Sequence, residues 1–149
     1  MEERTIRAAA LGKYLVVSYS TMDTWFKNGL LGDKFMNLGR GQFREFSFKD
    51  VCAARIVQEV LNATRSIDIA KKAVDSFRKL NEKSLKEQHL ELLITFKGPH
   101  ISIGLSHVGR EEQTSKVKSS SGYTAIFIPV AKIMENVANT FPELIEVDI

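Results

Sequence analysis

The sequence predicts an α+β fold: a helical N-terminal half with a hairpin, then a small C-terminal unit of three or four strands and one helix. Apolar residues recur at helical spacing through the first 80 residues and alternate as in strands from residue 90 onward. A polar, charged stretch over 81–89 separates the two patterns. We therefore expect a linker there, between an N-terminal domain over 1–80 and a C-terminal domain over 90–149.

Two short helices open the predicted N-terminal domain. Apolar side chains form one stripe over 5–15, and a second helix is expected over 20–28. Ser18 or Ser20 is suited to cap the second helix, because a serine hydroxyl accepts a hydrogen bond from an unpaired N–H of the first turn. Gly29 follows at the position where a left-handed residue ends many helices.

A hairpin is predicted between the second and third helices. Residues 32–46 are rich in glycine and alternate around Phe35, Phe43 and Phe46, which predicts two short strands joined by a turn at 37–41.

Serine caps also predict a third and a fourth helix. Ser47, followed three residues later by Asp50, predicts a capping box at the start of a helix over 48–63. Ser66 precedes apolar residues at helical spacing, so we expect a fourth helix over 67–80.

Strand-like alternation dominates the C-terminal domain. Three strands are expected, over 90–97, 100–107 and 123–130. Residues 108–122 are polar and predict a loop. Pro129 is expected to end the third strand, a helix follows over 131–140, and a last edge strand is expected over 144–149.

The composition is that of an ordinary globular protein and disfavours several classes. Hydrophobic residues make up 44% of the chain and charged residues 26%. No run of about eighteen apolar residues occurs, so we expect no membrane span. The acidic start of the chain does not resemble a secretory signal. Because Cys52 is the single cysteine, no internal disulfide can form, and we expect a cytoplasmic location.

The predicted order of helix, tight turn, helix, hairpin, helix and helix defines a winged helix-turn-helix. In such a module the second helix enters the DNA major groove, which is about 12 Å wide. Basic residues on the hairpin reach neighbouring phosphates and fix the register.

Two blocks of this chain resemble the MerR family of transcription regulators. Residues 17–31, VSYSTMDTWFKNGLL, resemble its signature V-S-x-x-T-(L/I)-R-x-(Y/W)-x-x-x-G-L-(L/I) and align with it without gaps. Residues 42–51, QFREFSFKDV, resemble its wing exit G-Y-R-x-Y-(S/T)-x-x-D-(L/V). The resemblance covers about 5–80 and implies a DNA-binding module of the same fold.

The resemblance assigns roles to three residues and departs from the family at two. Arg44 matches the wing arginine that approaches the DNA backbone, and Thr21 matches the recognition-helix threonine. Trp25 occupies an aromatic position that packs or touches phosphate. Ser20 and Asp23 stand where the family usually has arginines, so sequence preference is expected to differ. The family's long coiled coil and metal-sensing cysteines have no counterpart here.

Charge supports double-stranded DNA as the partner of the first half. Residues 1–90 carry 16 Lys+Arg and 11 Asp+Glu, a net of +5, whereas residues 91–149 carry 5 and 7, a net of −2. The candidate DNA-binding residues are Tyr19, Ser20, Thr21, Thr24, Lys27, Lys34, Arg40, Gln42 and Arg44.

The C-terminal unit is too small to be stable alone, so we expect it to pack on the N-terminal module or pair with a second chain. A homodimer would match palindromic DNA half-sites. Binding of a protein or small-molecule effector by this unit is the alternative. We expect no metal, cofactor or enzymatic activity, because no cysteine or carboxylate pair accompanies His89, His100 and His107 at ligand spacing.

Two other functions compete with a dimeric transcription regulator. An excisionase-type architectural protein would bend DNA and assemble along it. A protein–protein adaptor would keep the fold without DNA affinity, and Ser20 and Asp23 are its best support.

The wing can be tested by substitution. Replacing Arg44 or Arg40 with alanine is expected to weaken DNA binding and flatten its salt dependence. Binding with one phosphate contact fewer releases fewer counterions from the DNA. Unchanged binding across a gel-shift salt series would count against the wing.

Overall fold

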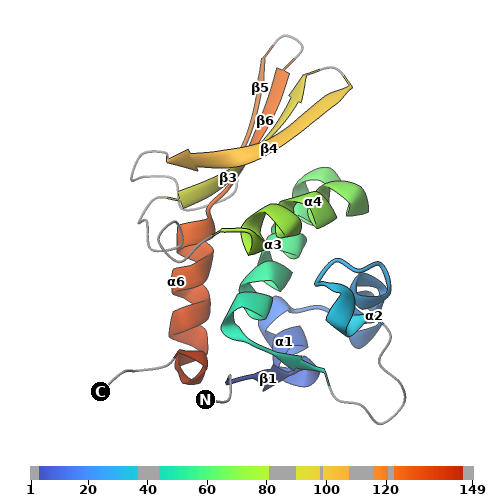
Figure 1. Ribbon diagram of the computed structural model, residues 1–149, viewed down its shortest axis with the longest axis vertical. Coiled ribbons are helices and arrows are strands. Elements are labelled where there is room, and N and C mark those ends of the chain that lie inside the picture. The colour runs from blue at the N-terminus through green and yellow to red at the C-terminus, as the bar shows by residue number, and fades with distance from the viewer. Residues whose placement is uncertain are drawn as a thin grey trace.

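The computed structural model describes residues 4–36, 44–80, 90–97, 99–107, 116–120 and 123–145. Over these residues the chain is an α+β protein with five α-helices and two small antiparallel sheets (Figure 1). The predicted fold class is confirmed at this level. In the view of Figure 1 a four-stranded sheet lies at the top, and the helices lie below it.

The first two helices form close to the predicted positions. α1 covers Ala8–Leu15 and α2 covers Tyr19–Lys27. Ser18 is the N-cap of α2, since its hydroxyl accepts a hydrogen bond from the Thr21 backbone N–H at 3.2 Å. Gly29 has a φ of +70°, as expected for the left-handed end of a helix.

Both remaining serine caps are also confirmed. α3 covers Phe48–Thr64 and begins with the capping box, in which Ser47 and Asp50 each accept a hydrogen bond from the other's backbone. α4 covers Ile67–Arg78, and the Ser66 hydroxyl accepts a hydrogen bond of 3.2 Å from its first turn.

A two-stranded sheet that was not predicted from the sequence joins the segment before α1 to the segment before α3. β1 (Ile6–Arg7) pairs antiparallel with β2 (Glu45–Phe46), and Ile6 lies opposite Phe46. The expected helix over 5–15 therefore begins late, at Ala8, because the residues before it are strand partners of β2.

The prediction of a strand in the first arm of the hairpin is wrong. Asp33–Phe35 forms the 3-10 helix η1, which closes when the Phe35 amide donates to the Gly32 carbonyl at 3.2 Å. Phe35 and Phe46 are both buried in the core, with ring centroids 4.9 Å apart. Their burial explains the apolar positions from which a pair of strands was expected. The expected turn at 37–41 and Phe43 lie outside the described residues.

The four-stranded sheet has the order β4-β3-β6-β5, with every neighbouring pair antiparallel. Its strands are β3 (Leu90–Lys97), β4 (His100–His107), β5 (Lys116–Ser120) and β6 (Tyr123–Ile128). Leu92 lies opposite Ile128 and Ile94 opposite Ile126, and all four side chains are buried. One face of the sheet therefore belongs to the core.

Two predictions for the second half are wrong in part. β5 lies inside the expected loop over 108–122. Its backbone groups form hydrogen bonds with β6, and this pairing is not visible in the polar sequence of the segment. The expected strand over 144–149 starts instead with the 3-10 helix η2 (Pro142–Leu144), and its last four residues lie outside the described part of the chain.

α3 lies at the centre of a core that both halves share. It packs against α4, against β6 and against α6 (Val130–Thr140), which Pro129 precedes as predicted. Figure 1 shows α3 between α6 on one side and α1 and α2 on the other. Buried side chains of the sheet and of the N-terminal helices form one continuous hydrophobic cluster.

A buried carboxylate joins four segments of the N-terminal half. Asp50 is 1% exposed and accepts hydrogen bonds from Lys34 at 2.8 Å and from Arg78 at 2.9 Å. Arg78 also donates to the Leu31 carbonyl at 2.7 Å. Burial alone would raise the pKa of Asp50, but the hydrogen bonds from Lys34, the Ser47 amide and Arg78 outweigh it and hold the pKa below its usual value.

Asp50→Ala is expected to lower the free energy of unfolding by about 3 kcal/mol, because it leaves Lys34 and Arg78 without their buried partner. Asp75→Ala, at an exposed site of α4, is the control and should change it by less than about 0.5 kcal/mol. Since folding lowers the pKa of Asp50, its contribution is present above its unfolded value near 3.8 and is lost as the pH falls further. Urea unfolding of the wild type and of Asp50→Ala at pH 7 and pH 3 measures the loss of stability and its pH dependence. An equal difference in the free energy of unfolding at pH 7 and pH 3 would contradict the predicted pH dependence.

Candidate nucleic-acid interface

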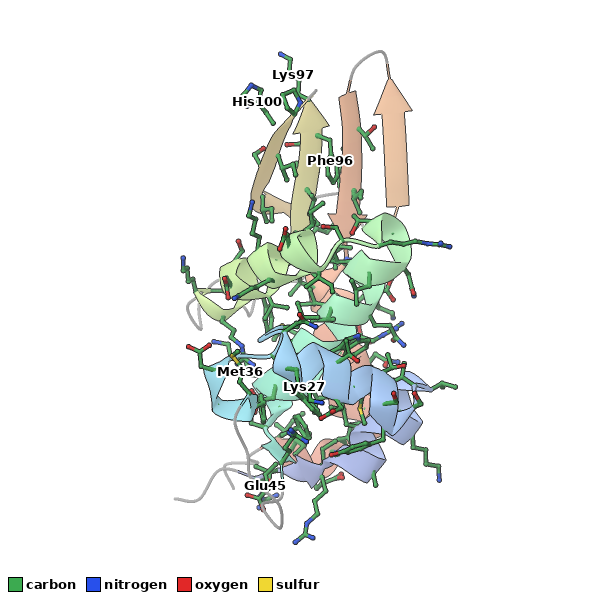
Figure 2. The ribbon with its side chains drawn as sticks, turned by 90° about the vertical axis from the view of Figure 1, so that its right-hand side faces the viewer. Lys27, Met36, Glu45, Phe96, Lys97 and His100 are labelled. Carbon is green, nitrogen blue, oxygen red and sulfur yellow. The ribbon has the colours of Figure 1, made fainter. Side chains whose placement is uncertain are left out.

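The exposed side of α2 carries most of the predicted DNA-binding residues. Met22, Trp25 and Phe26 anchor the helix in the core, with at most 7% exposure. The exposed residues of the helix are Tyr19, Ser20, Thr21, Thr24 and Lys27. Figure 2 views the molecule from the side of α2 and labels Lys27 on it. The exposed side of the helix therefore carries one tyrosine, three small hydroxyl side chains and one lysine.

Two of the threonines are already engaged in hydrogen bonds of the helix itself. The Thr21 hydroxyl lies 3.0 Å from the Ser18 hydroxyl of the N-cap. The Thr24 hydroxyl donates to the Ser20 carbonyl at 3.1 Å. Thr21 and Thr24 thus stabilise the first turns of α2.

Arg44 lies against α2. Its guanidinium donates to the Tyr19 hydroxyl at 3.0 Å, lies 3.6 Å from the Asp23 carboxylate and stacks over the Phe26 ring at 4.4 Å. Only 12% of its side chain is exposed. In this conformation Arg44 fixes the orientation of Tyr19 and connects β2 to the exposed face of α2.

Asp23 has a structural role that the sequence analysis missed. Besides Arg44, it pairs with Lys27, one helical turn further on, at 2.9 Å. The i,i+4 spacing of Asp23 and Lys27 was the signal that could have shown part of this arrangement. The carboxylate that departs from the MerR pattern is therefore offset by two cations.

Of the other wing candidates, Lys34 lies within the described residues. Lys34 is bound to Asp50, stacks over Phe35 at 4.9 Å and keeps 55% of its side chain exposed. Arg40 and Gln42 lie outside the described residues.

A groove of about 740 Å³ lies beside the N-terminus of α2. It is lined by Ala8, Ala9, Gly12, Lys13, Val16, Val17, Tyr19 and Met22. Gly12 lets α1 approach α2, since a Cβ there would lie 3.0 Å from the Met22 methyl carbon. Val16 is 86% exposed and has a φ of +57°, an uncommon conformation for a β-branched residue. This groove was not predicted from the sequence.

Sites of other kinds are not evident in the described part of the chain. It holds no group of three or more His, Cys, Asp or Glu side chains that could bind a metal. Cys52 is buried as predicted, and burial raises the pKa of its thiol to about 12, so it stays protonated at neutral pH. Among the described helices, none has the length and apolarity to cross a membrane.

Comparisons with protein-family models, curated proteins and solved structures found no match to this chain. The resemblance of residues 17–31 and 42–51 to the MerR family therefore stays a prediction from their motifs.

The conformation of Val16 gives a stability test for the turn between α1 and α2. Val16→Gly is expected to raise the free energy of unfolding by about 1 kcal/mol, because glycine adopts a positive φ without steric cost. Arg65, the other non-glycine residue with positive φ among those described, is the control. Arg65→Gly should gain less, since arginine is not β-branched. Thermal melts of both variants measure the difference; a lower melting temperature for Val16→Gly would refute the strain.

Proposed function

We propose that this chain is a DNA-binding transcription regulator that binds duplex DNA as a dimer, with α2 in the major groove and the segment over 33–46 on the backbone. The observation that carries the proposal is the two-sidedness of α2. Met22, Trp25 and Phe26 hold the helix in the core, and its small polar side chains face solvent.

Chemistry on the exposed side of α2 fits the edges of base pairs. Hydroxyl groups both donate and accept hydrogen bonds, so Ser20 and Tyr19 suit the mixed donor and acceptor pattern of the major groove. Lys27, with 72% of its side chain exposed, suits a phosphate. After Tyr19, the short side chains of Ser20 and Thr21 would allow the backbone of this turn to approach the bases closely.

Arg44 enters this proposal as a positioning residue. It holds the Tyr19 hydroxyl and offsets the charge of Asp23, which would otherwise repel phosphates. Arg44 in this position would support DNA affinity by orienting the side chains of α2 that meet the DNA. The phosphate contact expected of Arg44 from the sequence would then fall to Lys27 and Lys34, whose side chains are more exposed than that of Arg44.

A protein–protein adaptor is the second candidate function. It is favoured by the groove beside α2, where Val16 is 86% exposed and Tyr19 60% exposed. The adaptor predicts no retardation of any duplex at low salt. An excisionase-type architectural protein, by contrast, predicts binding together with DNA bending.

Lys27→Ala is expected to weaken binding to a mixed-sequence duplex by about 3- to 10-fold at 100 mM salt and to reduce the salt slope by about 1, as for the loss of one phosphate contact. Lys132→Ala is the matched control, because Lys132 is also an exposed helical lysine paired with a carboxylate of its own helix, Glu135 at 3.7 Å. It lies on α6, away from α2 in Figure 1.

Fluorescence anisotropy over a salt series measures both variants. The proposal is overturned if neither the wild type nor the variants bind any duplex at 50 mM salt, or if the two substitutions weaken binding equally. If the wild type binds duplex DNA, genomic fragments recovered on the immobilised protein give the site sequence, and a circular-permutation assay reports bending.

A further inference from the structure

The two edges of the four-stranded sheet differ in how they are protected. β4 and β5 are the outer strands, and an outer strand presents unpaired backbone N–H and C=O groups. Proteins commonly protect such edges with charged residues or proline. β5 carries Lys116 and Lys118, whereas β4, HISIGLSH, contains no Lys, Arg, Asp, Glu or Pro. Figure 2 shows β4 at the margin of the sheet, with no helix or strand drawn beyond it.

The register of β4 against β3 assigns its residues to the two faces of the sheet. Ile101 and Ile103 lie opposite Phe96 and Ile94, so they share the apolar face that packs toward the helices. Ile101 is 41% exposed although it lies on this face. Ser102 belongs to the other face, together with Gly104. The edge is thus eight residues long, free of Lys, Arg, Asp and Glu, and apolar on one side.

We propose that β4 pairs with β4 of a second copy of this chain, antiparallel about a twofold axis, so that two four-stranded sheets become one continuous sheet. The inference rests on the dimer of the proposed function and names its interface. An identical strand is a suitable partner, because it carries no Lys, Arg, Asp or Glu that would be brought next to its own copy. Pairing of two β5 edges would instead bring lysines of both copies together.

Symmetry restricts the register of this pairing. A twofold axis perpendicular to the sheet keeps the apolar faces of both copies on the same side. Residues that lie opposite each other then belong to the same face. One residue of β4 lies opposite its own copy, and the axis passes between these two. With the axis at Ile103, this residue lies opposite its own copy and Ile101 lies opposite position 105, which is leucine. With the axis at Gly104, Ile101 would lie opposite a histidine. With the axis at Ser102, Ile101 would lie opposite Ile103, but position 105 would lie opposite Pro99, outside β4. The register centred on Ile103 pairs all three apolar residues of this face with one another, and we infer that it is the one used.

A charge on the β4 edge tests the interface. In sedimentation at micromolar concentration the wild type is expected to have twice the chain mass of 16.8 kDa. Ile101→Lys is expected to raise the dimer dissociation constant at least 10-fold, because it places two lysines at the paired edges. Ile67→Lys is the matched control, since Ile67 on α4 has 42% exposure, close to the 41% of Ile101. It should leave the dimer intact.

Single cysteines test the register. In Ile103→Cys the two introduced thiols face each other across the axis, within the Cα separation of about 4.4–6.8 Å that a disulfide spans. Mild oxidation is expected to link most of the protein into covalent dimers. Ser102→Cys is the control, because Ser102 lies opposite Gly104 and its two copies are offset beyond about 7 Å. The native Cys52 is fully buried and does not interfere.

The interface is overturned if the wild type is a monomer, if Ile101→Lys stays as dimeric as Ile67→Lys, or if the two cysteine variants cross-link equally. These measurements contain no DNA, so they fail independently of the proposed function. Duplex binding of the Ile101→Lys protein to a single half-site separates the two: retained affinity in a chain that is monomeric supports both the DNA-binding surface and the β4 interface.

Discussion

The helical half of this protein depends on one buried carboxylate that belongs to several segments at once. Asp50 closes the first turn of α3, binds Lys34 of η1 and receives Arg78 from the end of α4. Through Arg78 it also reaches the carbonyl of Leu31, just after α2. A charge so deeply buried is tolerated because its oxygens accept hydrogen bonds from cationic groups. The orientation of α2 relative to α3 and α4 follows from this arrangement.

The exposed face of α2 is prepared by contacts on its hidden side. The Phe26, Phe35 and Phe46 rings pack together with centroid distances between 4.9 and 5.9 Å, joining α2, η1 and β2. Arg44 covers the Phe26 ring and extends to the polar side of the helix. Aromatic packing and an ion pair thus set the position of groups that would meet a ligand, which keeps the cost of ordering them on binding low.

Local signals in the sequence predicted local structure well. Serine caps gave the starts of α2, α3 and α4 because a cap is a contact within three residues. The β1–β2 pair, the 3-10 turn at η1 and β5 were missed because distant residues determine them: Ile6 meets Phe46, and Lys116–Ser120 is a strand through its pairing with β6. On α2, the apolar positions Met22, Trp25 and Phe26 were predicted from their spacing, and they form its buried side. The engagement of Arg44 with Asp23 and Tyr19 requires the tertiary fold and could not be predicted.

The central position of α3 has a consequence for how the chain unfolds. Because one helix contributes side chains to the packing of the N-terminal helices, of α6 and of the sheet, neither half retains a complete core without the other. Loss of the sheet would bare apolar side chains of α3, and loss of α1 and α2 would bare them on another side. Such coupling favours a single cooperative transition over stepwise melting of two independent bodies. The boundary that composition suggests near residue 85 separates two sequence patterns, and it does not divide the hydrophobic core.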